Sequence, residues 1–217
     1  MQTALTNKFI TIEGIEGVGK TTAVKVIQDY LIQQQQEFVL TREPGGTMIA
    51  EDIRKILLTP NDKEVITPNA ELLLMFACRA QHLKNVILPA LHAGKWVISD
   101  RFVDASYAYQ GGGRKIDMAK IEILDQWVVG DIQPHVTILL DASPKIGLTR
   151  AKNRGPHDRI EQEKIDFFER VREIYLERAA RFPQRFFIVD AAQPLEKVQV
   201  ELKKKINELF TDSHCAN

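Results

Sequence analysis

The chain of 217 residues contains only two cysteines, Cys78 and Cys215, which lie far apart in the sequence. So few cysteines exclude a framework of disulfide bonds and indicate a reducing compartment. No hydrophobic run approaches the length of a membrane span, and residues 1–8 lack the apolar core of a secretion signal. We therefore expect a cytoplasmic protein without a membrane partner.

An excess of charge of one sign is also missing, because 29 lysines and arginines balance 29 aspartates and glutamates. This balance argues against a nucleic-acid or membrane-surface partner, since both favour a basic protein. The five histidines form no His-x-x-x-His pair and no cluster with cysteine, so we expect no zinc site built by the protein. Small anionic substrates fit this composition, because they need only local arginines and lysines.

Short β-branched segments alternate with helical patterns along the chain. We expect strands at 8–13, 37–41, 95–99, 135–141 and 185–190, and helices at 20–35, 47–58, 69–93, 116–129, 144–153, 163–181 and 194–209. Such an alternation predicts an α/β fold with a parallel sheet and helices on both of its faces. We expect one domain with a core at about 8–209 and a polar tail at 211–217.

Residues 14–22, with the sequence Gly-Ile-Glu-Gly-Val-Gly-Lys-Thr-Thr, join the first expected strand to a helix. They fit the phosphate-loop pattern G-x-x-x-x-G-K-[ST], in which backbone N–H groups and a helix N-terminus surround phosphate oxygens. We expect Lys20 to reach the β- and γ-phosphates and the Thr21 hydroxyl to bind Mg²⁺. The pattern predicts that the protein binds a nucleoside triphosphate.

Charged residues follow two other expected strands, at the edge where ligands of parallel sheets bind. Arg42 and Glu43 precede a Pro-Gly-Gly turn, and Asp100 and Arg101 follow the third strand. Asp100 is typical of a carboxylate associated with Mg²⁺, and Arg101 of a phosphate ligand. Solvated or edge ion pairs are the structural alternatives. Residues 106–114 mix aromatic and polar side chains with three glycines, which suits a pocket wall or a mobile loop.

The helix expected at 69–93 carries Arg79 within its apolar stripe, three residues after Phe76. A charged residue in such a stripe needs a partner or a ligand. A ring that stacks on a base beside an arginine that bonds the base edge would form a base pocket. An arginine paired with a buried carboxylate explains the pattern equally well. We expect Cys78 to serve packing, because no group that would activate a nucleophile is evident.

Arginines gather around a Gly-Pro pair at about 150–162, a segment that we interpret as a lid. Arg150, Arg154 and Arg159 lie in it. A lid that closes over phosphates excludes water and brings arginines to the transferring group, whereas a solvated charge run is the alternative. After the last expected strand, Ala192 is small enough for an adenine to lie against the backbone.

Five motifs occur in order: Gly14-x-x-x-x-Gly19-Lys20-Thr21-Thr22, Thr41-Arg42-Glu43-Pro44-Gly45-Gly46, Phe76-x-x-Arg79, Asp100-Arg101-Phe102 and Ala108-Tyr109-Gln110-Gly111. Together they closely resemble the bacterial thymidylate kinases, over nearly the whole chain. The resemblance implies a phosphate-loop nucleoside monophosphate kinase fold with a five-stranded parallel sheet and a short lid. It also implies Mg²⁺-dependent transfer of the γ-phosphoryl group of ATP to dTMP, giving dTDP and ADP for dTTP supply to DNA synthesis. Members are usually homodimers.

The same resemblance implies roles for single residues. Phe76 would stack on thymine, Arg79 would bond its O4 edge, and Tyr109 would crowd a 2′-hydroxyl. The implied ATP site comprises Gly14, Ile15, Glu16, Gly17, Val18, Gly19, Lys20, Thr21, Thr22, Arg150 and Ala192. The implied dTMP site comprises Glu16, Arg42, Glu43, Pro44, Phe76, Arg79, Arg101, Ser106, Tyr109 and Gln110. The implied catalytic residues are Lys20, Arg101, Arg154, Asp100 and Glu16, with Thr21 and Asp100 on the metal, directly or through water.

Two alternatives stay open at this point. A phosphate-loop kinase for another nucleoside monophosphate or for a deoxynucleoside would share the fold, although the residue pairs Phe76–Arg79 and Tyr109–Gln110 argue against it. A nucleotide-dependent switch such as a GTPase is the rival of another class. It lacks support, because no Asn-Lys-x-Asp segment that reads guanine follows any expected strand.

The position of the catalytic arginine generates a prediction. One version of the family carries it inside the phosphate loop, where this chain has Gly17, and the other carries it in the lid. This chain resembles the second version, with Arg154 as the expected residue. By analogy with arginine fingers, Arg154→Ala is expected to lower kcat by roughly 10³–10⁵-fold, measured as ADP formation at saturating substrates. Near-normal turnover would contradict the assignment.

Overall fold

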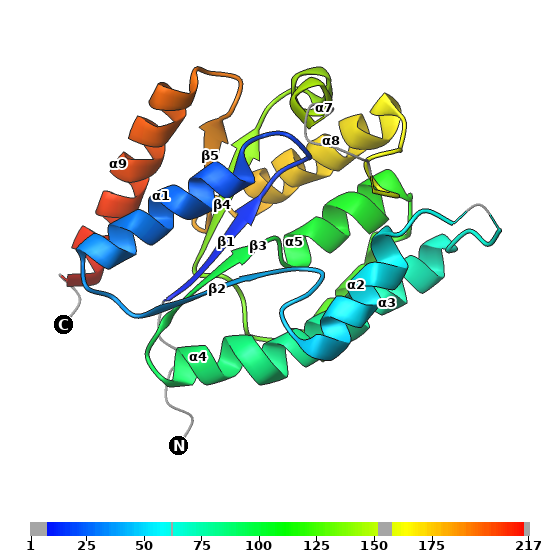
Figure 1. Ribbon diagram of the computed structural model, residues 1–217, viewed down its shortest axis with the longest axis horizontal. Coiled ribbons are helices and arrows are strands. Elements are labelled where there is room, and N and C mark those ends of the chain that lie inside the picture. The colour runs from blue at the N-terminus through cyan, green and yellow to red at the C-terminus, as the bar shows by residue number, and fades with distance from the viewer. Residues whose placement is uncertain (1–7, 62, 152–157, 215–217) are drawn as a thin grey trace.

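A five-stranded parallel sheet forms the centre of the computed structural model, which describes residues 8–61, 63–151 and 158–214 (Figure 1). The strands are β1 (Phe9–Glu13), β2 (Phe38–Arg42), β3 (Trp96–Asp100), β4 (Val136–Asp141) and β5 (Phe186–Asp190), in the spatial order β2-β3-β1-β4-β5. Each lies within one residue of its expected bounds. The predicted parallel sheet is therefore confirmed.

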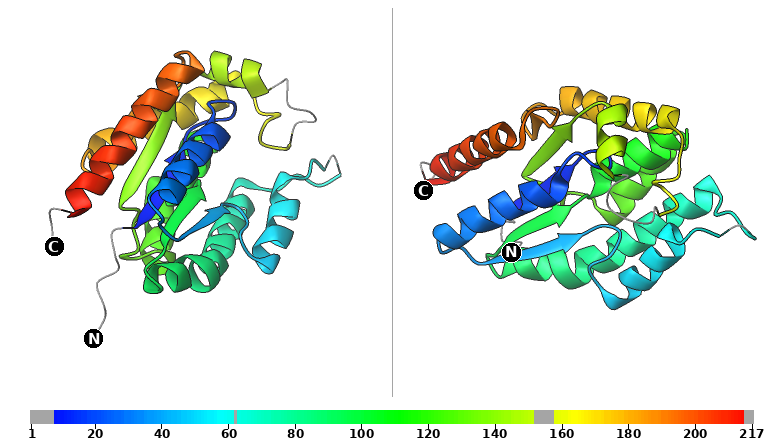
Figure 2. Two further views of the ribbon diagram at one scale, coloured as in Figure 1. Left: turned by 60° about the vertical axis from the view of Figure 1, so that its left-hand side comes forward. Right: turned by 45° about the horizontal axis from the view of Figure 1, so that its top comes forward.

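Helices cover both faces of this sheet (Figure 2). They are α1 (Lys20–Gln33), α2 (Met48–Leu58), α3 (Pro68–His82), the π-helical segment η1 (Leu83–Ile87), α4 (Leu88–His92), α5 (Val103–Ser106), the π-helical segment η2 (Tyr107–Gly113), α6 (Met118–Val128), α7 (Pro144–Ala151), α8 (Ile165–Arg181) and α9 (Leu195–His214). Within the described residues, no helix combines the length and apolar character that crossing a bilayer requires.

Strand β1 lies in the middle of the sheet and is buried along its whole length. Its side chains alternate between the two faces, as the twofold period of a strand requires. Ile10 joins a cluster with Ile27 of α1 and Leu202 of α9, whereas Phe9 joins a second cluster with Leu91 of α4. The loop that follows β1 is thus attached to the most deeply buried strand of the sheet.

The segment 103–113 was not expected to be helical, but it forms α5 and η2. Gly112 and Gly113 are buried against α8, where a Cβ on Gly112 would lie 2.6 Å from Ile174 Cγ1 and 2.7 Å from the Arg170 carbonyl oxygen, and Gly111 is buried against α6. The glycines therefore permit close packing of two helical segments rather than mobility. Of the two interpretations open from the sequence, the structure supports the pocket wall.

The last helix is longer than expected. Helix α9 continues to His214, beyond the predicted end at 209, so residues 211–214 of the predicted polar tail are helical. Phe210 explains the extension, because its ring stacks on Trp96 of β3 with centroids 4.5 Å apart and also contacts Tyr30 of α1. Tertiary packing of one aromatic residue has outweighed the polar character of the last residues.

Candidate active site

The phosphate loop lies between β1 and α1, as the sequence predicts. Gly14, Gly17 and Gly19 have positive φ angles of 131°, 75° and 98°, and a Cβ on Gly17 would collide with the Gly147 carbonyl oxygen of α7. No side chain caps the N-terminus of α1. The loop therefore needs glycine for its shape, and the helix terminus can receive an anion.

Lys20 lies inside this loop and is only 8% exposed. Its Nζ donates to the carbonyl oxygens of Gly14 at 3.0 Å and Ile15 at 2.7 Å. Burial lowers the pKa of the Lys20 ammonium from 10.5 to about 8, and the nearby Arg101 cation adds to this lowering. The ammonium is thus held next to the loop in a poorly solvated position, where a phosphate would favour its charged form.

Three side chains from separate segments meet beside the loop. Glu16 accepts from Arg101 Nη2 at 2.7 Å and from the Tyr109 hydroxyl at 2.8 Å, and Arg101 Nη2 also donates to the Tyr109 oxygen at 3.2 Å. Burial raises the Tyr109 pKa well above its ordinary range, and the Glu16 charge adds to this rise while the Arg101 cation opposes it, so this hydroxyl stays protonated. The structure thus brings these three predicted residues together.

The backbone of Arg101 has a φ of +70°, which is uncommon for a residue with a side chain. Three hydrogen bonds hold it: Arg101 N donates to Ile12 O at 3.0 Å, Ser99 Oγ donates to Arg101 O at 2.7 Å, and Phe102 N donates to Glu13 Oε1 at 2.8 Å. Burial, together with the charge of Asp104, raises the pKa of Glu13 to about 8. Arg101 is therefore fixed toward the phosphate loop by its surroundings.

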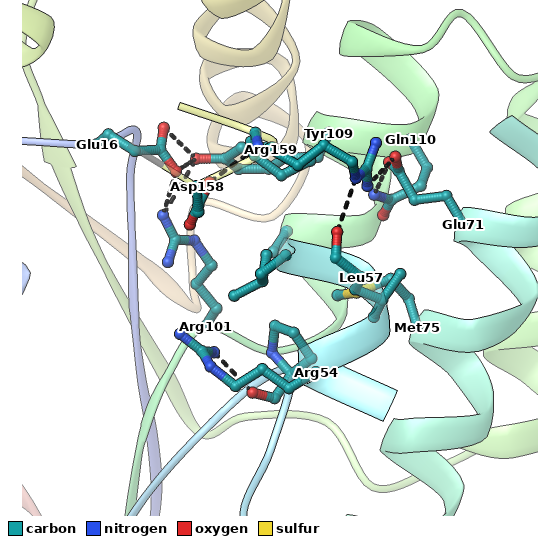
Figure 3. Close-up of a pocket in the computed structure, with 14 residues that line it drawn as sticks. Glu16, Arg54, Leu57, Glu71, Met75, Arg101, Tyr109, Gln110, Asp158 and Arg159 are labelled. Atoms are coloured by element: carbon teal, nitrogen blue, oxygen red, sulfur yellow. Dashed lines mark hydrogen bonds and ion pairs between the residues drawn. The ribbon is translucent and has the colours of Figure 1, made fainter. Parts of the chain in front are cut away.

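A small cavity of about 80 Å³ lies next to these residues (Figure 3). In that view Glu16, Arg101 and Asp158 lie on one side, and Glu71, Gln110 and Met75 lie on the other. The lining residues are Glu16, Pro44, Arg54, Leu57, Leu58, Glu71, Met75, Arg101, Ala105, Tyr109, Gln110, Asp158, Arg159 and Ile160. The cavity thus has a charged end near the phosphate loop, with Glu16 and Arg101, and a second end near α3, with Glu71, Gln110 and Met75.

Arg42 was expected to hold a phosphate, but it does not line this cavity. Its Nη2 bonds both oxygens of Glu51 at 3.0 and 3.1 Å, and its side chain is 53% exposed. Arg54 of α2 lines the cavity instead, and its Nη1 donates to the Pro44 carbonyl oxygen at 2.8 Å. The sequence carried a signal for Arg54, because helical spacing places it on the buried face of α2 with Leu57.

Phe76 and Arg79 were expected to face a base, and the structure does not place them so. Arg79 is completely buried and donates to Glu43 Oε2 at 2.8 Å and Ser106 Oγ at 3.0 Å, and its guanidinium lies 4.6 Å from the centre of the Phe76 ring. The alternative, an arginine paired with a buried carboxylate, is the one observed. Met75, one residue earlier on α3, lines the cavity instead.

Glu43 and Ser106 therefore lie behind the wall rather than on it. Glu43 also contacts His82 Nδ1 at 3.0 Å, and His82 Nε2 lies 2.6 Å from Thr41 Oγ1. Sequence reasoning missed His82, because nothing local marks a histidine whose partner is 39 residues away. These contacts join α3 to the end of β2 and support the position of Pro44, which is on the wall as predicted.

The described part of the predicted lid covers the cavity. Arg159 Nε donates to the Leu57 carbonyl oxygen at 2.7 Å, Arg159 N donates to Leu58 O at 3.0 Å, and Asp158 and Ile160 line the cavity. Arg154, the expected catalytic arginine, lies outside the described residues. The segment after that gap is thus bound to the C-terminal end of α2.

A second hollow, of about 250 Å³, lies on the other side of the phosphate loop. Arg150 lines it and donates from Nη1 to the Ala191 carbonyl oxygen at 2.7 Å. Gly17, Gly19, Ala191 and Gln193 also line it, whereas the expected Ala192 is exposed and is not on its wall. In the turn after β5, Ala191 and Gln193 therefore line the hollow, whereas Ala192 between them does not.

Asp100 and Thr21 are the oxygen donors that suit a cation shared with phosphates. Asp100 Oδ1 is buried without a hydrogen-bond partner among the described residues, 3.9 Å from Arg101 Nη1, and Thr21 is exposed at the start of α1. The described residues contain no group of three metal-ligating side chains. This donor set fits Mg²⁺, which binds few protein oxygens and completes its shell with phosphates and water.

A parallel α/β sheet with a phosphate loop, an adjacent cavity and an arginine-bearing lid defines a phosphate-loop kinase of the nucleoside monophosphate kinase class. Comparisons with known proteins narrow this class. Residues 12–202 match the family model described as "Thymidylate kinase". The chain is 53% identical over 191 residues to the thymidylate kinase of Pseudomonas putida (strain W619), covering 88% of this chain and 92% of that protein.

Other relatives agree. The thymidylate kinase of Ruthia magnifica subsp. Calyptogena magnifica is 50% identical over 196 residues, which cover 90% of this chain and 95% of that protein. A crystal structure of thymidylate kinase from Ehrlichia chaffeensis superimposes with a TM-score of 0.74 at 32% identity, covering 92% of this chain and 97% of that one. The chain belongs to the thymidylate kinase family.

The buried Lys20 makes stability depend on pH. Its pKa of about 8 lies below the ordinary 10.5, so the unfolded chain binds more protons between these values and folding stability rises with pH there. Between pH 7.5 and 10, the unfolding free energy of wild type should rise by about 2 kcal/mol relative to that of Lys20→Met. Urea unfolding at pH 7.5 and 10 measures this.

The exposed Lys25 on the same helix, changed to Met, is the matched control, because its side chain is 72% exposed. Its pH dependence gives the background for the comparison. A difference between wild type and Lys20→Met that stays constant with pH would show that Lys20 is not poorly solvated.

Proposed function

We propose that the protein transfers the γ-phosphoryl group of ATP to dTMP, giving dTDP and ADP for dTTP supply. Its membership of the thymidylate kinase family, at about half identity over most of the chain, carries the proposal. The two hollows on either side of the phosphate loop support it, since phosphoryl transfer needs a donor and an acceptor that meet at one loop.

ATP is assigned to the hollow of Arg150, Ala191 and Gln193, with its phosphates in the loop beside Lys20. Asp100 and Thr21 would hold the Mg²⁺ that binds with ATP, directly or through water. The ion would neutralise phosphate charge. The residues of this chain position the two phosphates and neutralise developing charge. No nucleophilic side chain or general base is required for such a transfer.

The monophosphate is assigned to the cavity beside Arg101. Its phosphate would lie at the charged end, where Arg101 is fixed by Glu16 and Tyr109 and where Arg54 adds a second cation. The base would lie at the α3 end, between Met75 and Gln110. The cavity of about 80 Å³ is smaller than a nucleotide, so the lid segment with Arg159 must move to admit dTMP and then covers it.

The test is ADP formation from Mg-ATP with an acceptor panel of dTMP, dUMP, UMP, dAMP, dCMP, dGMP, thymidine or no acceptor. We expect strong turnover with dTMP, weak turnover with dUMP and little without acceptor. Strong turnover with another acceptor would keep the kinase class and overturn the assigned acceptor. Hydrolysis that dTMP leaves unchanged would replace the kinase by an ATPase or a switch.

We also propose that the protein acts in the cytoplasm as a homodimer of single-domain kinase chains. Helix α6 supports the dimer, because Ile123 and Trp127 are four residues apart and therefore share a face, with 67% and 81% of their surfaces exposed. Large apolar side chains so exposed on one helix are typical of an interface.

Trp127→Glu is expected to shift the protein from dimer to monomer, because a buried carboxylate would lack a partner at the interface. Sedimentation equilibrium at micromolar concentration measures this. Val200→Glu on α9, where Val200 is 68% exposed, is the matched control and should leave the mass unchanged. A monomeric wild type, or a dimeric Trp127→Glu variant, would contradict this interface.

A further inference from the structure

Glu71 of α3 is a buried carboxylate that the sequence did not single out. It is 1% exposed and lines the cavity at the end that we assign to the base. Three side chains donate to it: Gln110 Nε2 at 2.8 Å, Arg114 Nε at 3.0 Å and Arg159 Nη2 at 2.6 Å. Taking a carboxylate out of water is costly, and these three donors offset that cost while fixing the orientation of the groups around Glu71.

The side-chain amide of Gln110 binds Glu71 with one of its two polar groups, and its other polar group has no partner among the described residues. Its Nε2 donates to Glu71 Oε1, while its Oε1 is buried and has no hydrogen-bond partner among the described residues. A carboxylate beside two guanidinium groups only accepts hydrogen bonds, so the edge of Gln110 that faces it must be the NH₂ group. The amide oxygen is then the group left for a ligand in the cavity.

This orientation has a consequence for pyrimidine bases. Thymine carries an N–H donor at ring position 3, whereas cytosine carries a lone pair there. An amide oxygen at the base end accepts from the first and repels the second. A site built around one hydrogen-bonding pattern rejects the wrong pattern strongly, because a buried polar group is then left unpaired.

We propose that Glu71 is a positioning residue that selects thymine over cytosine by fixing the amide of Gln110 with its oxygen toward the base. The inference rests on the proposed function, because it assumes dTMP in this cavity. Arg114 and Arg159 hold the carboxylate in place from two further segments, and Arg114 is itself bound by Glu163, which follows the lid. The two arginines donate to Glu71, so Glu71 only accepts hydrogen bonds. Glu71 in turn binds the NH₂ group of Gln110, which leaves the Gln110 amide oxygen to accept from the ligand.

The decisive variant is Glu71→Gln, which keeps the size of the side chain. Its new carbonyl oxygen should stay with Arg114 and Arg159, so that its NH₂ group faces Gln110. Two NH₂ groups cannot face each other favourably, and Gln110 therefore turns its own NH₂ group toward the base. We expect kcat/KM for dTMP to fall, kcat/KM for dCMP to rise, and their ratio to drop by about 100-fold.

Two controls separate this role from a structural one. Arg159→Gln removes a lid contact of Glu71 but leaves Gln110 bound, so it should lower both kcat/KM values and leave their ratio unchanged. In a Gln110→Met background, Glu71→Gln should no longer change the ratio, because the amide that transmits the effect is absent. A parallel fall for dTMP and dCMP in Glu71→Gln, or a ratio change that persists without Gln110, would overturn the proposal.

A second variant covers the case in which Glu71→Gln does not fold. Glu71→Asp keeps the negative charge for both arginines but shortens the side chain, so Gln110 is released and presents either edge. The ratio should then fall by a smaller factor, with thermal unfolding close to that of wild type. Wild-type turnover of dTMP tests the proposed function separately: its absence would refute that function, whereas normal wild-type turnover with unchanged ratios in the Glu71 variants would refute only the role of Glu71.

Discussion

The buried carboxyl group of Glu13 joins the parts of the molecule that have to stay in register. It ends the central strand immediately before the phosphate loop, accepts from Phe102 N at 2.8 Å and accepts from the Tyr175 hydroxyl of α8 at 2.7 Å. These two contacts connect the loop, the strained backbone of Arg101 and the helix that follows the lid. The distance between the phosphate loop and the cavity is therefore set from the interior rather than by surface contacts.

Other buried charged groups also hold segments in position from the interior of the molecule. Glu43 and Arg79 lie behind the cavity wall with side chains that are at most 1% exposed. Asp104 is completely buried and pairs with Arg178 and Arg185, whose side chains are 9% and 13% exposed. Such groups add little net stability, and removal of one partner costs about 3–5 kcal/mol because a buried charge is left alone. Their contribution is conformational, since each orients a segment that carries a wall residue such as Pro44 or Gln110.

The sequence predicted what depends on local pattern. All five strands and the phosphate loop follow from β-branched runs and glycine spacing, and Glu16, Arg101, Tyr109 and Gln110 are found at the cavity as expected. The direction in which each side chain of α3 points was harder to predict. Consecutive side chains on a helix are rotated by about 100°, and this rotation decides whether Phe76 or Met75 faces the cavity. The carboxylate partners of Arg42 and Arg79 lie in other segments, and no local pattern shows such pairings, so the sequence did not indicate that these arginines would be off the cavity wall.

The contact of η2 with α8 limits how this pocket wall could change in evolution. Gly112 lies against Ile174 and the Arg170 backbone, and Arg170 Nε donates back to the Gly112 carbonyl oxygen at 3.1 Å. A side chain at position 112 would meet the backbone of Arg170 as well as Ile174, so shortening Ile174 alone does not make room for it. Paths to a new acceptor that reshape this part of the wall would therefore require α8 to shift as a unit, whereas an exchange at Met75 can occur singly.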